Sequence, residues 1–267
     1  MSEMRKSIFI TGAASGVGRE TALLFAGKGW FVGACDINGS ALAELEREIG
    51  SDRALFFQAD VADPEGFADA MARFAAATNN RLDLLFSNAG IGSGGMLDEQ
   101  PWDDVVRIVN VNFLGVMISV RAAIPLLRNS PGSLCLITSS SSAIFGTAGI
   151  SVYSATKHAA RGLAEALSIE LKRYGVRAST LLPGLVDTPL LSGPMRALAP
   201  PDGMWRLVAP RAVAETVLRA YQEDRLHWYI PEELRDFHLD VVTAPEAVRE
   251  ERAALLEMMA RHADANR

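Results

Sequence analysis

Short apolar runs alternate along this chain with longer segments in which apolar residues recur at the helical period. The apolar runs predict strands at residues 7–10, 30–35, 55–59, 82–86, 134–137, 176–182 and 226–230. The segments between them predict helices at residues 19–26, 40–49, 64–77, 101–129 and 153–174. Strands and helices that alternate at these lengths form a parallel sheet with helices on both faces. The pattern therefore predicts an α/β fold with a doubly wound sheet of about seven strands.

Two segments depart from this rhythm. Residues 189–210 hold several prolines and glycines among Leu, Met and Trp, and such long connections are usually functional. We expect a substrate lid there. After residue 243 the chain has a helical pattern, and the spacing of Thr243 and Glu246 predicts a capping box at its start. Because no linker or repeat is visible, we expect a single domain over residues 1–267, with a lid at 189–210 and a helical tail at 243–267.

The helix predicted at 101–129 is apolar almost all round between Val105 and Val120, which is typical of a helix buried on two sides. We expect one side to pack on the sheet and the other on a second subunit, in a homo-oligomer. Polar residues interrupt the run, so it falls short of the ~18 unbroken apolar residues of a membrane span. The apolar stretch at 8–10 is too short for a signal peptide. The prediction is a soluble cytoplasmic protein with no membrane segment.

Composition and charge narrow the possible partners. The chain has 267 residues, of which 49% are hydrophobic and 22% charged, as in packed globular proteins. Its formal net charge is −6, so no global basic field attracts nucleic acid. Cys35 and Cys135 are far apart, and the four histidines lack metal-ligand spacing. We therefore expect no nucleic-acid partner and no metal site.

A glycine-rich loop follows the first predicted strand. Residues 11–18 read Thr-Gly-Ala-Ala-Ser-Gly-Val-Gly, just before a helix. Glycines let backbone N–H groups approach a pyrophosphate, and a helix N-terminus favours its negative charge. The spacing differs from the commonest dinucleotide fingerprint, and the alternative is a tight turn that closes a βα unit. The expected contacts to the pyrophosphate come from Gly12, Ser15, Gly16, Val17 and Gly18.

A carboxylate ends the second predicted strand, at Asp36. At this position it can accept hydrogen bonds from the adenosine ribose and would repel a 2′-phosphate. The alternative is a surface turn before Asn38. No Arg or Lys follows, so we expect the cofactor to be NAD rather than NADP. After the fourth strand comes Asn88-Ala89-Gly90, at a strand end where such sheets bind ligands.

Tyr153 and Lys157 are four residues apart, on one face of a predicted helix. A free phenol has a pKa of about 10 and is a poor base, but a neighbouring ammonium and a positive nicotinamide ring would favour the phenolate. Such a tyrosine can take the proton of an alcohol. The alternative is an ordinary surface pair, although lysine is scarce in this chain.

A run of serines precedes this pair, at residues 139–142. A serine at a strand end can donate a hydrogen bond to a developing oxyanion, and spacing from Tyr153 favours Ser140. The alternative is a polar turn at the strand exit, and four consecutive serines leave the choice among them open.

Taken together, these motifs resemble the short-chain dehydrogenase/reductase family in its single-domain form, which implies a Rossmann-type fold. The resemblance spans residues 7 to about 190, and its motifs occur in family order. It implies a catalytic set of Asn112, Ser140, Tyr153 and Lys157. It implies that NAD is bound by the glycine loop, Asp36, Asp60, Val61, Asn88, Ala89, Gly90, Tyr153, Lys157, Pro183, Gly184, Val186 and Thr188.

The resemblance also implies individual roles. Asn112 would hold a water in a proton relay, and Ser140 would position the substrate oxygen. Tyr153 would be the general acid and base, while Lys157 would bind the nicotinamide ribose and lower the pKa of Tyr153. NADP-preferring relatives often carry a basic residue where this chain has Ser15, which agrees with NAD.

The C-terminal region departs from the family pattern. Many relatives have a Thr-Gly and a later Asp-Gly-Gly after the last strand, whereas this chain continues from residue 226 into a long helical tail. That region often builds a tetramer interface, so a tetramer is in doubt. A dimer through the helices at 101–129 and 153–174 remains open.

The residues expected to face the substrate are mostly apolar: Met96, Leu97, Ile144, Phe145, Ile150, Leu185, Leu190, Met195, Leu198 and Trp205. No Arg or Lys that could clamp an anion precedes Arg196 in the lid. We therefore expect an NAD-dependent oxidoreductase acting on a small hydrophobic secondary alcohol or its ketone. One alternative is an NAD(P)H-dependent carbonyl reductase. Another is a nucleotide-sensing protein that kept the fold without catalysis.

Overall fold

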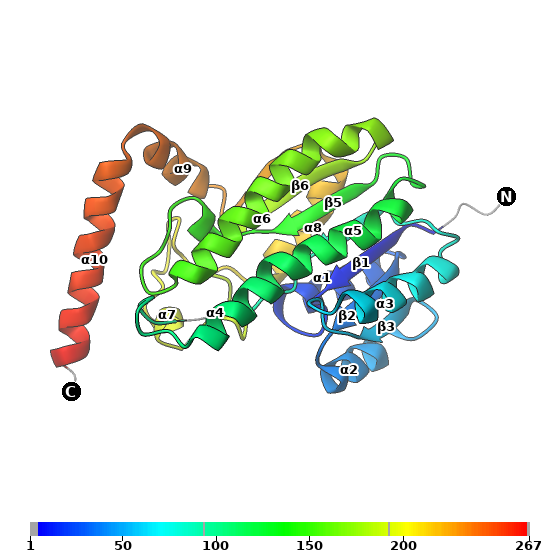
Figure 1. Cartoon of the computed structure of the whole chain (residues 1–267), viewed down its shortest axis with the longest axis horizontal. Coiled ribbons are helices and arrows are strands. Elements are labelled where there is room, and N and C mark those ends of the chain that lie inside the picture. The colour runs from blue at the N-terminus through cyan, green and yellow to red at the C-terminus, as the bar shows by residue number, and fades with distance from the viewer. Residues whose placement is uncertain (1–4, 93, 192, 266–267) are drawn as a thin grey trace.

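The structure is a computed structural model that describes residues 5–265 apart from 93 and 192. Seven strands form one sheet, in the order β3-β2-β1-β4-β5-β6-β7, and every pairing is parallel. The strands are β1 (Ser7–Thr11), β2 (Phe31–Asp36), β3 (Ala54–Gln58), β4 (Leu84–Ser87), β5 (Leu134–Thr138), β6 (Arg177–Pro183) and β7 (His227–Ile230). This arrangement confirms the predicted α/β class (Figure 1).

Helices cover both faces of the sheet (Figure 1). The first face is covered by α1 (Gly16–Gly27), α2 (Gly39–Ile49) and α8 (Pro210–Gln222). The second face is covered by α3 (Pro64–Ala77), α5 (Gly115–Leu127) and α6 (Ser151–Glu170). The remaining helical segments are α4 (Trp102–Val109), η1 (Asn110–Leu114), η2 (Ser141–Ala143), η3 (Leu171–Tyr174), α7 (Gly193–Ala197), α9 (Leu234–Thr243) and α10 (Pro245–Ala265).

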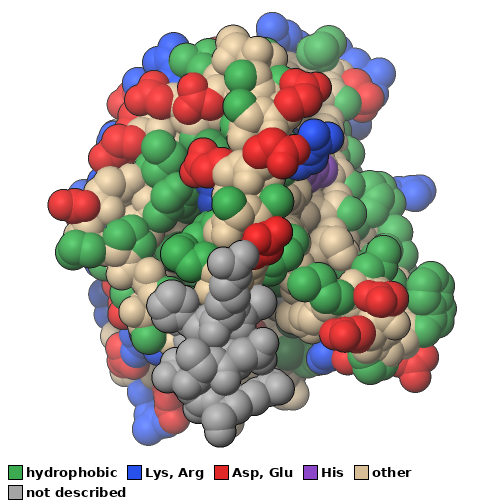
Figure 2. Space-filling model, turned by 90° about the vertical axis from the view of Figure 1, so that its left-hand side faces the viewer, with side chains coloured by type: hydrophobic (Ala, Val, Ile, Leu, Met, Phe, Trp, Pro, Cys, Tyr) green, Lys and Arg blue, Asp and Glu red, His purple; other side chains and the backbone are tan. Residues whose placement is uncertain are grey.

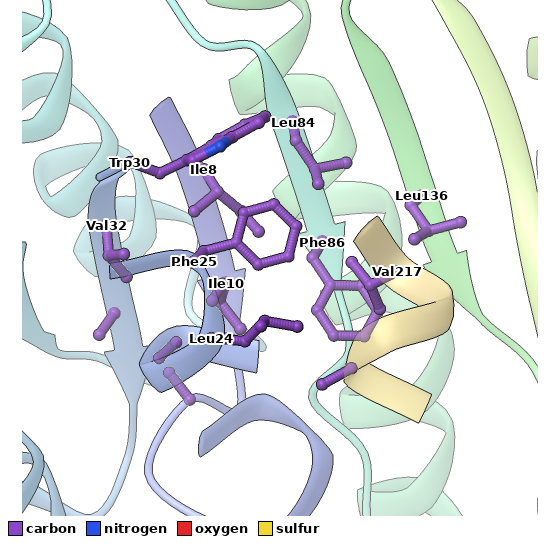
Figure 3. Packing of buried hydrophobic residues seen from close by; sticks show 14 of the residues in the cluster. Ile8, Ile10, Leu24, Phe25, Trp30, Val32, Leu84, Phe86, Leu136 and Val217 are labelled. Carbon is purple, nitrogen blue, oxygen red and sulfur yellow. The ribbon is translucent and has the colours of Figure 1, made fainter. Parts of the chain in front are cut away.

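The strands divide their side chains between two cores because successive residues point to opposite faces. In β1, Ile8 and Ile10 lie in the core under α1 and α8, whereas Phe9 lies in the core under α3 and α5. Figure 3 shows the first core, where Phe25 of α1 lies among the strand side chains. Each such side chain contributes roughly 1.5–3 kcal/mol on burial, so a strand buried on both faces is strongly specified.

The neighbours β1 and β4 mark the point where the strand order reverses. From β1 the chain winds outward to β3, and from β4 it winds the other way to β7. In sheets of this kind, a crevice opens outside the carboxyl ends of the strands at the reversal. The glycine loop follows β1 and Asn88 follows β4, so the fold places both at this crevice.

The helix predicted at 101–129 is present from Trp102 to Leu127, but its middle is not α-helical. A π-helical stretch, η1, lies between α4 and α5 and contains Asn112. A π-helical turn has the same apolar periodicity on either side of it, so the hydrophobic pattern does not reveal it; such turns are frequent at functional sites. The run from Trp102 to Leu127 is 26 residues long with a mean hydropathy of 1.6, enough by length and composition to cross a membrane. Here Val116, Val120 and Leu127 are buried against the sheet, as in a core helix.

The capping box predicted at Thr243 is also wrong. Thr243 is the last residue of α9, and its hydroxyl donates to the carbonyl of Leu239 at 2.8 Å. The next helix, α10, begins at Pro245, because a proline at the first helical position needs no hydrogen-bond partner for its nitrogen. The helix predicted after residue 243 is present as α10, and the separate helix α9 precedes it.

The C-terminal elements form a third, smaller core. Its buried residues are Ala143, Ile144, Leu182, Leu234, Phe237 and Val248. They come from η2, β6, α9 and α10, so the turn after the serine run is packed directly against the tail. Beyond this core, α10 extends along the edge of the molecule, at the left in Figure 1.

Candidate active site

The glycine loop between β1 and α1 is shaped by positions that have no room for a side chain. Gly12 has a φ of +67°, and a Cβ there would lie 2.9 Å from the Cα of Ala89. A Cβ on Gly18 would lie 1.9 Å from the carbonyl oxygen of Gly12. The loop is therefore pressed against both the start of α1 and the segment after β4. Both clashes are with protein backbone, so these glycines allow the loop, α1 and the segment after β4 to pack closely.

The N-terminus of α1 differs from those of the two helices that follow. The side chains of Asn38 and Asp63 cap α2 and α3 by accepting hydrogen bonds from backbone N–H groups. Ser15 makes no such bond at α1, whose first turn also lacks acidic residues. The first N–H groups of a helix have no partner within it and attract an anion. These residues fit the phosphates of a dinucleotide.

Asp36 lies at the end of β2, and two backbone amides fix its carboxylate. Oδ2 accepts from the N–H of Ala14 at 2.9 Å, and Oδ1 accepts from the N–H of Asn38 at 2.9 Å. One oxygen is thus tied to the glycine loop. The side chain remains half-buried beside the crevice, so its negative charge faces that opening. Asp60 and Val61 follow the adjacent β3, where the Asp60 carboxylate accepts from the N–H of Ala62 at 2.8 Å.

Asn88 ties three strands together at the reversal. The hydroxyl of Thr11 accepts from the backbone N–H groups of Asn88 and Ala89, at 2.9 and 3.0 Å. The side-chain oxygen of Asn88 accepts from the hydroxyl of Thr138 at 3.2 Å. The ends of β1, β4 and β5 are thereby locked in register. Thr11 and Thr138 were not expected as site residues; their position at strand ends was the available signal.

Asn112 lies in η1 and is fully buried. Its side-chain oxygen accepts from the N–H of Ile91 at 2.8 Å, and its amide donates to the carbonyl of Ile91 at 2.9 Å. The amide also donates to the hydroxyl of Thr156 on α6, at 3.4 Å. Asn112 therefore joins the segment after Gly90 to the helix that carries Tyr153. The hydrogen bonds of Asn112 thus hold these two segments together. The relay water that the resemblance implies at Asn112 stays a prediction.

Lys157 is buried among these elements, with 2% of its surface exposed. Its ammonium donates to the carbonyl of Thr138 at 3.1 Å and lies 5.5 Å from the ring centroid of Tyr153. A Cβ on Gly90 would lie 3.4 Å from Nζ, so the segment after β4 packs closely over the ammonium. Burial lowers the pKa of Lys157 to about 8, which still leaves most of the side chain charged near neutrality.

Tyr153 is paired with Ser140. Burial raises the pKa of the Tyr153 phenol, and the hydrogen bond with the Ser140 side chain opposes that rise. Burial is the larger influence, so the pKa of the phenol lies above its ordinary value. The lowering of this pKa by Lys157 together with a nicotinamide ring stays a prediction. Of the neighbouring serines, Ser139 donates to the carbonyl of Lys157 at 2.7 Å and is thereby occupied. The geometry thus distinguishes Ser140 within the run.

The segment after β6 crosses back over the glycine loop. A Cβ on Gly16 would lie 2.9 Å from the methyl group of Thr188, so the two segments are in contact. The N–H of Gly184 donates to the carbonyl of Ile230 at 2.8 Å, and Val186 forms a parallel bridge with Val208. Pro183 ends β6 at the same edge. All the residues assigned to the cofactor from sequence therefore follow strand ends or lie on α1 and α6, at the carboxyl edge of the sheet.

The predicted lid segment carries exposed apolar side chains at Leu190 and Leu198. Leu190 also packs over Gly92, on the segment after β4. Arg196 forms an ion pair with Asp187 at 2.9 Å, so its charge is already partnered. Trp205 was expected to face the substrate, and it packs against the third core. Whether this segment closes on a substrate stays a prediction. Within the described residues, no group of three His, Cys, Asp or Glu could hold a metal ion.

The comparisons with known proteins agree with this geometry. The family described as "short chain dehydrogenase" matches residues 6–196. Cyclohexanol dehydrogenase of Acinetobacter sp. (strain SE19) is 34% identical over 226 residues, covering 82% of this chain and 88% of that protein. Trans-4-hydroxycyclohexanecarboxylate dehydrogenase of Sinomonas cyclohexanicum is 32% identical over 196 residues, covering 70% and 75%.

A solved structure of similar shape is 3-ketoacyl-(acyl-carrier-protein) reductase from Brucella melitensis in complex with NADH. It has a TM-score of 0.76 and 28% identity, and the match covers 85% of this chain and 98% of that one. The chain belongs to the short-chain dehydrogenase family, whose members are oxidoreductases that use nicotinamide cofactors.

Proposed function

We propose that this protein is an NAD-dependent dehydrogenase of small hydrophobic secondary alcohols, with alicyclic alcohols as the best class. The observation that carries the proposal is the grouping of buried Ser140 and Lys157 with half-buried Tyr153, at the edge of the sheet where the glycine loop lies. A carboxylate, Asp36, lies at the same edge. A sensor without catalysis would have no need for a buried lysine beside this tyrosine, because burying the ammonium costs desolvation energy.

The residues present give each step a donor or acceptor. Bound NAD would accept a hydride from the carbon of the alcohol. Ser140 would donate its hydroxyl hydrogen to the substrate oxygen, and Tyr153 as phenolate would take the alcohol proton. The Lys157 ammonium, which lies 5.5 Å from the Tyr153 ring, would favour that phenolate together with the positively charged cofactor. Because burial raises the pKa of Tyr153, oxidation should speed up as the pH rises toward that pKa.

The preference for NAD rests on Asp36. Its carboxylate is fixed by Ala14 and Asn38, so it cannot swing away to admit a 2′-phosphate without breaking both hydrogen bonds. Bringing a phosphate dianion against this charge would be unfavourable. Ser15, at the mouth of the loop, offers no positive charge in compensation.

The substrate class rests on the lining of the predicted pocket and on the relatives. The side chains after η2 and in the predicted lid are largely apolar, and the ion pair with Asp187 occupies Arg196. Two relatives are named for cyclohexane-ring alcohols. A ring with one secondary hydroxyl satisfies both observations. Since NAD in cells is usually mostly oxidised, we propose alcohol oxidation as the direction.

We also propose a homodimer and a cytoplasmic location. An apolar groove of about 500 Å³ lies on the outer surface of α4 and α6, lined by Leu97, Val109, Phe113, Ser151, Val152, Ala155, Thr156 and Ala159. Trp102 and Ile169 are exposed on the same helices, at 74% and 73%. A second copy packed on these helices would remove this apolar surface from water.

The test is turnover by the purified protein with a panel of secondary alcohols, from small aliphatic through cyclohexanols to steroids. Formation of reduced cofactor is followed with NAD and, in parallel, with NADP. Tyr153→Phe should reduce kcat by about a thousandfold, because general acid–base catalysis is worth roughly 10²–10⁴. NAD affinity should stay within about twofold, since the phosphate loop is untouched.

Tyr174→Phe is the matched control, because this half-buried tyrosine lies in η3 at the far end of α6. It should leave kcat unchanged. Full activity in Tyr153→Phe would remove Tyr153 from the mechanism. No turnover with any alcohol or ketone, alongside intact NAD binding, would favour the sensor alternative.

A further inference from the structure

One face of α6 carries four polar side chains at four-residue intervals: Tyr153, Lys157, Arg161 and Glu165. The first two face the proposed reaction. The second pair lies further along the helix, where it meets β7 and α9. Arg161 is mostly buried, with 18% of its side chain exposed.

Arg161 reaches the turn that carries Ser140. Its Nη1 donates to the carbonyl of Ala143 at 3.2 Å. Ala143 is the last residue of η2, and Ser140 caps that turn by accepting from the N–H of Ser142 at 3.1 Å. The guanidinium is therefore tied to the same short turn that sets the position of the Ser140 hydroxyl.

The other donors of Arg161 are fixed as well. Nε donates to the Glu165 carboxylate at 2.8 Å, and Nη2 lies 3.2 Å from Nε2 of His238 on α9. A guanidinium has no acceptor atom, so Nε2 of His238 must accept. The proton of His238 then resides on Nδ1, which lies 2.6 Å from the hydroxyl oxygen of Tyr229 and donates to it. The contact thus requires neutral His238.

The charges around His238 come from three elements. Arg161 and Glu165 face it from α6, and His227 lies on β7 with its Nε2 at 3.0 Å from Glu165. Glu232 and Arg235, in the segment from β7 into α9, act on Tyr229. Burial lowers the pKa of His238, and the charges of Arg161 and His227 lower it further. Protonation of His238 would place two cations in contact.

We propose that Arg161 is a positioning residue that holds the Ser140 turn in place, and that it does so only while His238 accepts its hydrogen bond. The link runs from α9 through the guanidinium to the Ala143 carbonyl. It rests on the proposed function, because Ser140 positions the substrate oxygen there. Misplacement of a catalytic group by about 1 Å can cost about a hundredfold in rate, so a backbone anchor beside Ser140 matters for kcat.

The first experiment compares Arg161→Met with wild type. Methionine keeps the length of the side chain and removes every donor. We expect kcat to fall about tenfold and NAD affinity to stay within about twofold, because the turn is displaced and the phosphate loop is not. Arg47→Met is the matched control and should change neither value, because Arg47 is exposed on α2 and donates to the carbonyl of Ala43 in its own helix.

The second experiment separates the titration of His238 from that of Tyr153. His238→Gln offers a carbonyl oxygen that can accept from Arg161 and does not titrate. Between pH 8 and about pH 5, a range that extends below the usual histidine pKa because that of His238 is lowered, wild type should lose more of its kcat than this variant. Equal losses would overturn the dependence on neutral His238.

The third readout does not depend on the proposed function. Amide hydrogen exchange in the ligand-free protein at fixed pH should be several-fold faster at residues 142–144 in Arg161→Met, because the turn opens more easily. Unchanged exchange and unchanged kcat would overturn the proposal. Changed exchange in a protein without turnover would keep the anchor and remove the proposed function instead. A fall in kcat matched by an equal loss of NAD affinity would also overturn it.

Discussion

The glycine loop and the C-terminal tail, at opposite ends of the chain, are held by different kinds of contact. In the loop, backbone lies against backbone: a Cβ on Gly18 would be 1.9 Å from the carbonyl oxygen of Gly12. In the tail, side chains reach across: the Arg252 guanidinium lies 4.4 Å from the centroid of the Trp205 ring and 4.8 Å from that of Phe237. A backbone contact tolerates only glycine, whereas a side-chain contact can be made by several residue types.

The two regions also differ in how they stand to the family model. The family match covers residues 6–196, and the side-chain contacts that hold the tail lie beyond it, at 205–252. Within the match, short motifs suffice to identify the glycine loop, because a backbone contact of this kind requires glycine at a fixed position. Beyond it, the fold depends on pairs such as Arg252 and Trp205 that no short motif contains.

The largest effect is expected in the loop. Gly18→Ala would drive a methyl group into the Gly12 carbonyl, and no flexible side chain is available to yield. We expect NAD affinity to fall by more than about a hundredfold, together with a loss of about 1–3 kcal/mol in the free energy of unfolding. Calorimetric titration with NAD and thermal unfolding measure the two.

Gly27→Ala is the matched control on the same helix. A Cβ on Gly27 would meet nothing within 4 Å, so this substitution should leave NAD affinity unchanged and stability equal or slightly higher. If the two variants bound NAD equally well, the loop would not be the phosphate site.

The next effect in size is expected at Asp36. Asp36→Ala removes the negative charge that opposes a 2′-phosphate and frees the N–H groups of Ala14 and Asn38. The ratio of kcat/KM with NAD to that with NADP should fall about ten- to hundredfold, as the loss of a charged hydrogen-bonding partner is worth roughly 1.5–3 kcal/mol. Turnover with both cofactors measures this ratio.

Asp63→Ala separates the charge from its structural contacts. Asp63 also accepts from a backbone N–H, that of Glu65 at 3.1 Å, but it caps α3. The variant should lose about 1 kcal/mol of stability and keep the cofactor ratio. An unchanged ratio in Asp36→Ala would mean that Asp36 only supports the loop.

The sequence predicted the sheet well because its strands are buried on both faces and so form continuous apolar runs. The four-residue spacing of Tyr153 and Lys157 likewise needed only the helical period. The π-helical turn at Asn112 was missed, since it leaves the apolar pattern unchanged on either side. No element was assigned to residues 211–225, although Val213 and Val217 of α8 have the spacing of one helix face.

The third core was beyond prediction for a different reason. Ala143 follows the serine run, whereas Phe237 and Val248 lie about a hundred residues later, and only the fold brings them together. The contact of Arg161 with His238 is of the same kind. Both are pairings between distant side chains, and periodicity within one segment carries no information on them.

The C-terminal helix α10 is held by few buried side chains. On the face that includes α10, acidic, basic and hydrophobic side chains are mixed (Figure 2). Leu255 and Met258 are exposed on α10, whereas Val248 is buried in the third core. Next to Val248 in space, Arg252 lies over the rings of Trp205 and Phe237, at 4.4 and 4.8 Å from their centroids. This guanidinium joins α10 to the predicted lid segment.

The smallest effect is therefore expected at Arg252. Arg252→Ala removes a cation–π contact worth about 0.5–1 kcal/mol, and with it the tie between α10 and Trp205. The KM for the alcohol should rise about threefold. NAD affinity should stay constant, because the glycine loop is held by its own backbone contacts. Limited proteolysis by subtilisin should also cut α10 faster, since a helix with fewer buried contacts opens more readily.

Arg249→Ala is the control that isolates the stacking, because Arg249 is on the same helix and pairs with its neighbour Glu250, at 2.8 Å. It should change neither KM nor the rate of cleavage. If Arg252→Ala freed α10 to proteolysis and left KM unchanged, the tail would be a packing element with no bearing on the substrate. If it also weakened NAD binding, the two ends of the molecule would be coupled. The tail would then affect the proposed cofactor site as well as the proposed substrate site. A tail that changes substrate binding alone must have no contacts that influence the glycine loop.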